Sequence, residues 1–184
     1  MYESKKYNNF YKSASTLGLI MGLATAAIHF IFYLLEYKMR QPLAIILLTL
    51  LAVIVTVVYG TIKYRNSLGG YISYFQAFIF GVMIFLFAGI VGAVYSYVFN
   101  NIDPDYVYRQ LETYRGYLLN SGFTETKVDE IITDSKAALD YQMQHPFQSI
   151  FSSACFNTFI GAIFCLISSA FLRKSNPNFN NLNT

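Results

Sequence analysis

The sequence is poor in charge, because Asp, Glu, Lys and Arg make up only 12% of its 184 residues, about half the share of a soluble domain. It contains no Trp and only two cysteines, Cys155 and Cys165. A disordered chain would need many charges and little hydrophobicity, and a disulfide scaffold would need more cysteines, so both classes are excluded. A nucleic-acid-binding protein is not expected, because the net charge of +3 is small and spread over loops and tails.

Hydrophobic residues account for 55% of the chain and gather in four runs without Asp, Glu, Lys or Arg. These runs cover residues 13–35, 43–62, 75–99 and 147–172. An apolar run of about 18 or more residues is long enough to cross the hydrocarbon core of a bilayer as a helix. A transmembrane barrel would instead show segments of about ten alternating residues. The sequence therefore predicts an all-α integral membrane protein with four transmembrane helices.

The basic residues beside these runs predict the orientation of the chain. Residues 1–12 contain three, the loop after the second run contains Lys63 and Arg65, and residues 173–184 contain two. The loop after the first run contains only two. Because Lys and Arg in short flanks remain in the cytoplasm, we expect a multi-pass protein of the cytoplasmic (inner) membrane with both termini cytoplasmic. The tail of residues 173–184 is expected to be disordered.

The segment between the third and fourth runs is predicted to form a helical hairpin over residues 103–145. Asp103-Pro104 is typical of a helix start, Ser121-Gly122 of a helix end, and Thr124 can cap a second helix. The segment is net acidic, so we expect an extracytoplasmic αα-hairpin. Each helix carries one apolar stripe: Val107, Leu111, Tyr114 and Leu118 on the first, and Val128, Ile131, Ile132, Leu139 and Met143 on the second.

Two interpretations of these stripes remain open. The two helices can pack on each other and on the mouth of the bundle, or they can dock a partner or lie among lipid headgroups. We favour the first interpretation, because two facing stripes cover each other without help.

A small set of polar residues lies within the predicted spans. Thr25, His29, Tyr33 and Glu36 share one face of the first helix, and Asn157 lies within the fourth. A proton relay could use a His and a Glu, because His titrates near neutrality. We favour a structural role, with neutral His29 bonded to a neighbouring helix and Glu36 in the headgroup region, since transporters usually bury several ionisable groups near the midplane.

Small residues recur every four positions along the first helix, at Ala14, Gly18, Gly22 and Ala26. In lipid, small residues mark places where helices approach closely. We favour packing within the chain for this ridge, and a homodimer is the alternative.

No motif for chemistry is found in the sequence. The His and Cys residues lack ligand-like spacing, no Ser lies in a nucleophile turn, and Gly69-Gly70 lacks the Lys-Ser/Thr of a phosphate loop. We therefore expect no cofactor, no metal and no enzymatic activity. The leading hypothesis is a non-enzymatic scaffold or accessory subunit whose partners are the lipid bilayer and a homo-oligomer or membrane protein. The alternatives are a small oligomeric transporter or channel and, least favoured, a membrane enzyme acting on lipid or peptidoglycan precursors.

The order of these features resembles one family, domain-of-unknown-function family 4199, whose members are small membrane proteins with four spans. The likeness covers roughly residues 12–174. It depends on Tyr64-Arg65, Gly69-Gly70-Tyr71-Ile72-Ser73-Tyr74, Gln76-Ala77-Phe78, Gly81 and Asp103-Pro104. One departure is Ile79, since members often have a basic residue close to this position. The resemblance implies an inner-membrane location and brings no known activity, substrate or catalytic residue.

Overall fold

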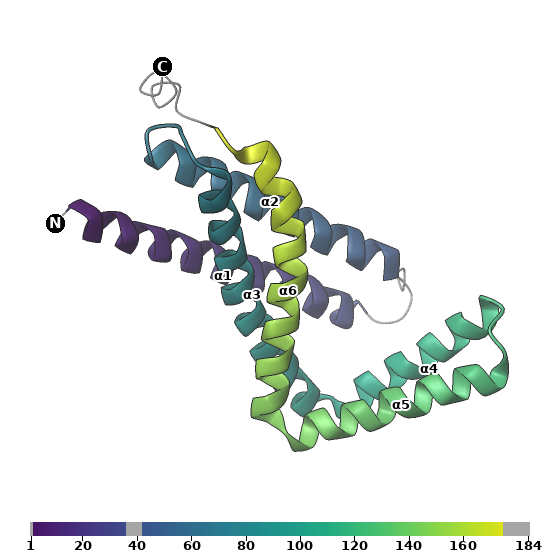
Figure 1. Cartoon of the computed structure of the whole chain (residues 1–184). Helices are drawn as coiled ribbons and strands as arrows, with labels where there is room; N and C mark the ends of the chain where they lie inside the picture. Colours follow the sequence, from purple (N-terminus) through teal and green to yellow (C-terminus); the bar gives the residue numbers. More distant parts are fainter. Residues whose placement is uncertain (1, 36–41, 175–184) are drawn as a thin grey trace. The chain divides into compact units, whose positions relative to one another are not determined.

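The computed structural model describes residues 2–35 and 42–174, which form six α-helices. The helices are α1 (Tyr2–Leu34), α2 (Pro42–Ser67), α3 (Tyr74–Ile102), α4 (Pro104–Asn120), α5 (Glu125–Gln144) and α6 (Pro146–Leu172) (Figure 1). Four of them, α1, α2, α3 and α6, are long and apolar enough to cross a membrane. The predicted all-α fold with four membrane-spanning helices is therefore confirmed.

Helix α1 is longer than the apolar run that it contains. It begins at Tyr2, so most of the stretch expected as an N-terminal tail belongs to the same helix as the first span. Residues 2–12 contain neither Gly nor Pro, and nothing in them stops a helix. The start of the apolar run thus marks where the sequence becomes hydrophobic and not where the helix begins. Glu36 and residues 175–184 of the expected disordered tail lie outside the described residues.

The chain divides into two compact units, which we describe separately. The bundle unit comprises the residues up to Gly92 and those from Ser153 onwards, and the hairpin unit comprises Ala93–Ser152. Helices α3 and α6 contribute residues to both units.

Helix α3 is the centre of the bundle unit, and glycines of its neighbours let it approach them closely. A Cβ added to Gly18 of α1 would lie 2.5 Å from the Cβ of Phe87, and one added to Gly22 would lie 2.7 Å from the Cβ of Val91. Gly161 of α6 lies directly against the Phe85 side chain. The buried residues of α3 in this unit are Ala77, Phe80, Gly81, Ile84, Phe85, Ala88 and Gly89.

The hairpin unit begins and turns largely as predicted. The Asp103 carboxylate accepts a hydrogen bond from the Tyr106 N–H at 3.0 Å, and Pro104 occupies the first turn of α4. Gly122 follows the end of α4 with a φ of 88°, a left-handed conformation that favours glycine. Thr124 stands at the N-cap of α5, as predicted, although its hydroxyl makes no capping hydrogen bond.

Candidate functional site

The predicted polar face of α1 does not form a buried relay among the residues that the structure describes. His29 is exposed, and its ring Nδ1 lies 2.8 Å from the Thr25 carbonyl of its own helix. The Thr25 hydroxyl donates to the Gly22 carbonyl at 2.9 Å, and the Tyr33 ring stacks on Phe30. Instead of the expected bond to a neighbouring helix, the Nδ1–H of His29 donates to the Thr25 carbonyl within α1.

Asn157 lies on a different surface from His29. It is half-buried on α6, against Gly89 of α3, where a Cβ added to the glycine would meet the Asn157 amide nitrogen at 3.2 Å. Glu36, the carboxylate that a relay would use, lies outside the described residues. The described residues therefore bring Thr25, His29 and Tyr33 together on one helix face and leave Asn157 apart.

The small-residue ridge of α1 is occupied within the chain at three of its four positions. Gly18 and Gly22 pack on α3, as described above, and Ala14 is fully buried in the same core. Ala26, the fourth member, is partly buried. Close packing inside the bundle accounts for Gly18 and Gly22.

The most elaborate polar arrangement of the bundle unit joins the α2–α3 turn to the end of α6. The Arg65 guanidinium donates to the Leu172 carbonyl at 3.3 Å, and the Tyr74 hydroxyl donates to the Leu166 carbonyl at 3.0 Å. Ile72 and Lys174 form an antiparallel bridge with N–H···O distances of 3.0 and 2.9 Å. We call this set of contacts the clasp.

The clasp satisfies backbone groups that a helix end leaves free. The last four carbonyls of a helix have no partner within it, and Arg65 supplies a charged donor to one of them in α6. Gly69 and Gly70, with φ values of 85° and 90°, allow the chain to reverse tightly before Ile72. The Lys174 ammonium also lies 5.8 Å from the centre of the Tyr71 ring, which is within cation–π range.

An aromatic stack lies beside the clasp and joins three helices. The rings of Tyr64 from α2 and Phe80 from α3 are nearly parallel, with centroids 4.3 Å apart. Phe10 of α1 meets both rings edge-on, at 5.6 Å from Tyr64 and 5.5 Å from Phe80. Tyr64 and Phe80 are buried, so this stack anchors one end of the bundle core.

The sequence did not point to the clasp as a unit. Tyr64-Arg65 and the stretch from Gly69 to Tyr74 carry the family resemblance, which does not indicate that they contact α6. Their partners on α6 are backbone carbonyls of ordinary apolar residues, Leu166 and Leu172, which leave no side-chain signal.

The hairpin unit is held by a short apolar core and by ion pairs between its helices. The core contains Leu118 of α4 with Val128 and Ile132 of α5, all buried. Tyr114 and Met143 were expected in the stripes but are 45% and 38% exposed. The facing stripes are therefore fully buried near the turn, while Val107, Leu111 and Leu139 farther along the hairpin are half-buried.

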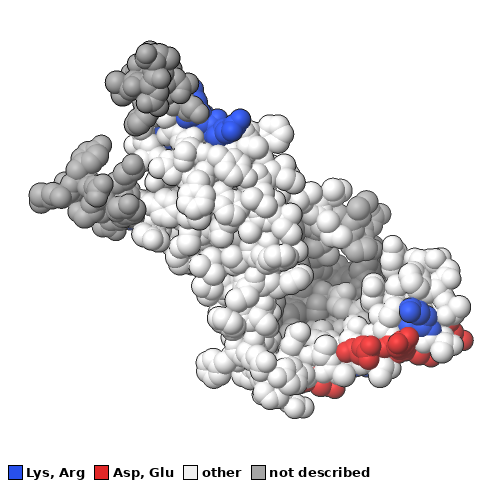
Figure 2. All heavy atoms as spheres, viewed as in Figure 1, with Lys and Arg blue, Asp and Glu red and all other residues white. Residues whose placement is uncertain are grey.

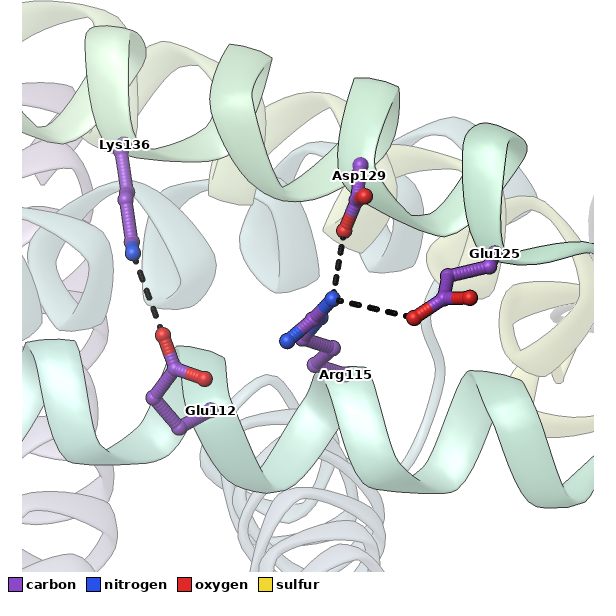
Figure 3. A network of polar contacts seen from close by, with 5 residues as sticks. All are labelled: Glu112, Arg115, Glu125, Asp129 and Lys136. Carbon is purple, nitrogen blue, oxygen red and sulfur yellow. Dashed lines mark hydrogen bonds and ion pairs between the residues drawn. The ribbon is translucent and has the colours of Figure 1, made fainter.

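Three ion pairs cross between α4 and α5 (Figure 3). The Arg115 guanidinium lies 2.7 Å from Asp129 and 4.0 Å from Glu125, and the Lys136 ammonium lies 3.1 Å from Glu112. All of these side chains are at least one-third exposed, so solvent screens each pair and its contribution is small.

The other end of the hairpin has polar links of its own. The Tyr108 hydroxyl donates to the Asp140 carboxylate, and this hydrogen bond raises the pKa of Tyr108 above its ordinary value. Tyr108 consequently remains a neutral donor through the physiological pH range. Arg109 pairs with the capping residue Asp103 at 2.9 Å.

Large apolar side chains remain exposed around the hairpin turn. Tyr117 is 62% exposed, Phe123 47% and Leu119 39%. Among the described residues, no group of three or more His, Cys, Asp or Glu side chains could hold a metal ion. The hairpin thus presents exposed aromatic side chains around its turn, close in the sequence to the acidic residue Glu125.

Comparison with known proteins gives a family and nothing finer. No curated protein and no solved structure matches the chain. A family model described as a protein of unknown function (DUF4199) matches residues 16–174. This stretch covers most of the four spans, the clasp and the whole hairpin. The chain therefore belongs to the DUF4199 family of proteins of unknown function.

Proposed function

We propose that the chain is a non-enzymatic scaffold or accessory subunit of the cytoplasmic (inner) membrane that holds a second membrane protein through its hairpin. The observation that carries the proposal is the exposure of Tyr117, Leu119 and Phe123 around the turn between α4 and α5. Aromatic side chains are enriched in the buried centres of protein interfaces.

The hairpin does not need a partner in order to form. Its helices already share the core of Leu118, Val128 and Ile132 and are bridged by Arg115 and Lys136. The exposed apolar residues near the turn are therefore additional to those that hold the hairpin together. A rigid helical pair with spare aromatic surface can bind without paying much ordering entropy.

The proposed orientation places this surface outside the cytoplasm and both termini inside. It follows from the excess of Lys and Arg beside the termini and the α2–α3 turn, and from the acidic character of the hairpin. A labelling map tests it with single-cysteine variants Arg109→Cys and Lys174→Cys in a chain whose Cys155 and Cys165 are replaced by Ala. A membrane-impermeant maleimide should label the first variant in intact cells and the second only after permeabilisation. Labelling of both in the same compartment would remove the proposed threading.

A photo-reactive amino acid tests the partner directly. Placed at Phe123 in the full chain in native membranes, it should give one discrete cross-linked species containing another membrane protein, identified by mass spectrometry. The matched control places the same group at Thr126, an exposed polar position on the adjoining helix, where no such species should form.

A second variant separates docking from chance collision. The substitution Tyr117→Ser should abolish the cross-link formed from Phe123, because it removes half of the exposed aromatic surface. Cross-links to lipid alone, or equal cross-linking from Phe123 and Thr126, would contradict the proposal. Flux across liposomes that falls on His29→Ala would favour a small oligomeric transporter or channel instead.

A further inference from the structure

Two segments that lie far apart in the sequence, each with two basic residues, are joined at the clasp. Lys63 and Arg65 come from the end of α2, and Arg173 and Lys174 follow the end of α6. The bond from Arg65 to the Leu172 carbonyl joins positions 107 apart, and the Ile72–Lys174 bridge fixes the same two segments. On the face shown in Figure 2, Lys and Arg side chains of the bundle unit gather at the end nearest the C-terminus of α6. We call these four residues the basic cluster.

The basic cluster meets no acidic side chain in the described part of the bundle unit. Where the structure describes side chains in the bundle unit, residues 9–35, 44–92 and 153–174, none is Asp or Glu. Arg65 has five N–H donors, and its buried Nε has no acceptor among the described residues. Lys63, Arg173 and Lys174 are exposed. A charge of this size at the end of a helical bundle is well placed to attract an anion.

The surroundings of the basic cluster indicate what kind of anion fits. Phe171, two positions before Arg173, is 84% exposed, and Phe75, which follows the clasp residue Tyr74, is 67% exposed. Both belong to the apolar spans that end at the clasp. A basic group edged by exposed aromatic residues matches a molecule with an anionic head and apolar tails.

We propose that the basic cluster binds the phosphodiester headgroup of an anionic phospholipid, with the acyl chains lying along Phe75 and Phe171. Exposed Lys63, Arg173 and Lys174 reach the headgroup oxygens, and Arg65 holds the two helix ends in place. Basic residues that lie between the ends of membrane helices bind anionic headgroups in this way. A soluble phosphate would bind the same charges but has no apolar part that could pack on Phe75 and Phe171.

Lipid retention by the purified full chain tests the proposal. The chain is exchanged into mixed micelles with equal amounts of phosphatidylglycerol and phosphatidylcholine, and the retained lipid is quantified by mass spectrometry. We expect enrichment of phosphatidylglycerol that declines as salt is added. The triple variant Lys63→Gln/Arg173→Gln/Lys174→Gln keeps Arg65 and the clasp bonds, and should lose roughly fivefold of this preference for each charge removed.

A matched variant removes the same charge from the hairpin unit. Arg109→Gln/Lys127→Gln/Lys136→Gln should retain phosphatidylglycerol as the natural chain does. Equal loss in both triple variants, no preference in the natural chain, or full competition by inorganic phosphate would each overturn the proposal. The comparison of the two lipids on the natural chain decides the matter even if a variant fails to fold. Because no partner protein takes part, the result is independent of the function proposed above.

Discussion

The bundle unit and the hairpin unit differ both in charge and in the way they are held together. The bundle unit has nine basic and two acidic residues in the full sequence, a net charge of +7, while the hairpin unit has four and eight, a net charge of −4. The bundle relies on glycines that let helices touch, and the hairpin on a small apolar core with exposed ion pairs. The same chain thus uses one packing chemistry suited to lipid and another suited to water.

The contrast has a physical origin in the surrounding solvent. Lipid tails are as apolar as Leu, so burying apolar side chains contributes little free energy to the association of helices in a membrane. Close van der Waals contact between the helices must supply it. In water, the burial of Leu118, Val128 and Ile132 itself favours association. The predictions below test whether each unit depends on its own kind of contact.

The largest effect is expected from Gly18→Leu. A Cβ at this position would lie 2.7 Å from the Ile84 carbonyl oxygen, which belongs to the backbone and cannot move aside cheaply. We expect a loss of about 3 kcal/mol of stability, measured by unfolding of the purified chain in mixed micelles. The control is Gly92→Leu, because nothing lies within 4 Å of an added Cβ there. Equal losses in the two variants would show that contact distance is not what holds the bundle.

A smaller and more local loss is expected from Ile132→Ala. This residue is 5% exposed in the short core of the hairpin, and its truncation leaves a cavity worth about 2 kcal/mol. Hydrogen exchange should become faster in α4 and α5 and remain unchanged in α1. Leu119→Ala, at a 39% exposed position of the same hairpin, is the matched control. Faster exchange throughout the bundle would mean that the two units do not unfold separately.

Tyr74→Phe tests the clasp and should cost about 1 kcal/mol, the usual value of one hydrogen bond. It removes the donor to the Leu166 carbonyl and leaves the ring in place. Exchange of the amides near the end of α6 should increase, while those of the hairpin stay as they were. Tyr59→Phe, on an exposed ring of α2, should change neither.

The smallest effect is expected from Arg115→Gln. It removes the pairs with Asp129 and Glu125, both of which are screened by solvent, so the hairpin should lose about 0.5 kcal/mol. The loss should shrink as NaCl is raised, because salt already weakens these pairs in the natural chain. A loss that does not depend on salt would indicate that Arg115 acts through packing.

Much of the fold could be predicted from the sequence because its patterns are local. Uncharged runs locate the spans, and Asp103-Pro104 with Ser121-Gly122 locate the ends of α4. The start of α1 was not predicted, because hydropathy indicates whether a residue prefers lipid or water. It does not show which backbone groups form helical hydrogen bonds. The stripe of α4 was overestimated at Tyr114, because periodicity cannot tell where two helices stop touching.

The candidate sites were harder to predict for a different reason. The role of His29 depends on whether its ring bonds to a neighbouring helix or to the Thr25 carbonyl of its own helix, and the sequence spacing allows both. The clasp depends on backbone carbonyls of α6, which every residue has. Contacts of this kind become visible only when the path of the chain is known.

The clasp also has a consequence for the order in which the protein is built. A chain is synthesised from its N-terminus, so Arg65 and Tyr74 exist long before Leu166, Leu172 and Lys174 do. Until α6 arrives, the donors of the α2–α3 turn have no carbonyls to bind. The clasp can therefore close only after α6 has been synthesised, and a product that ends before Leu166 cannot form it.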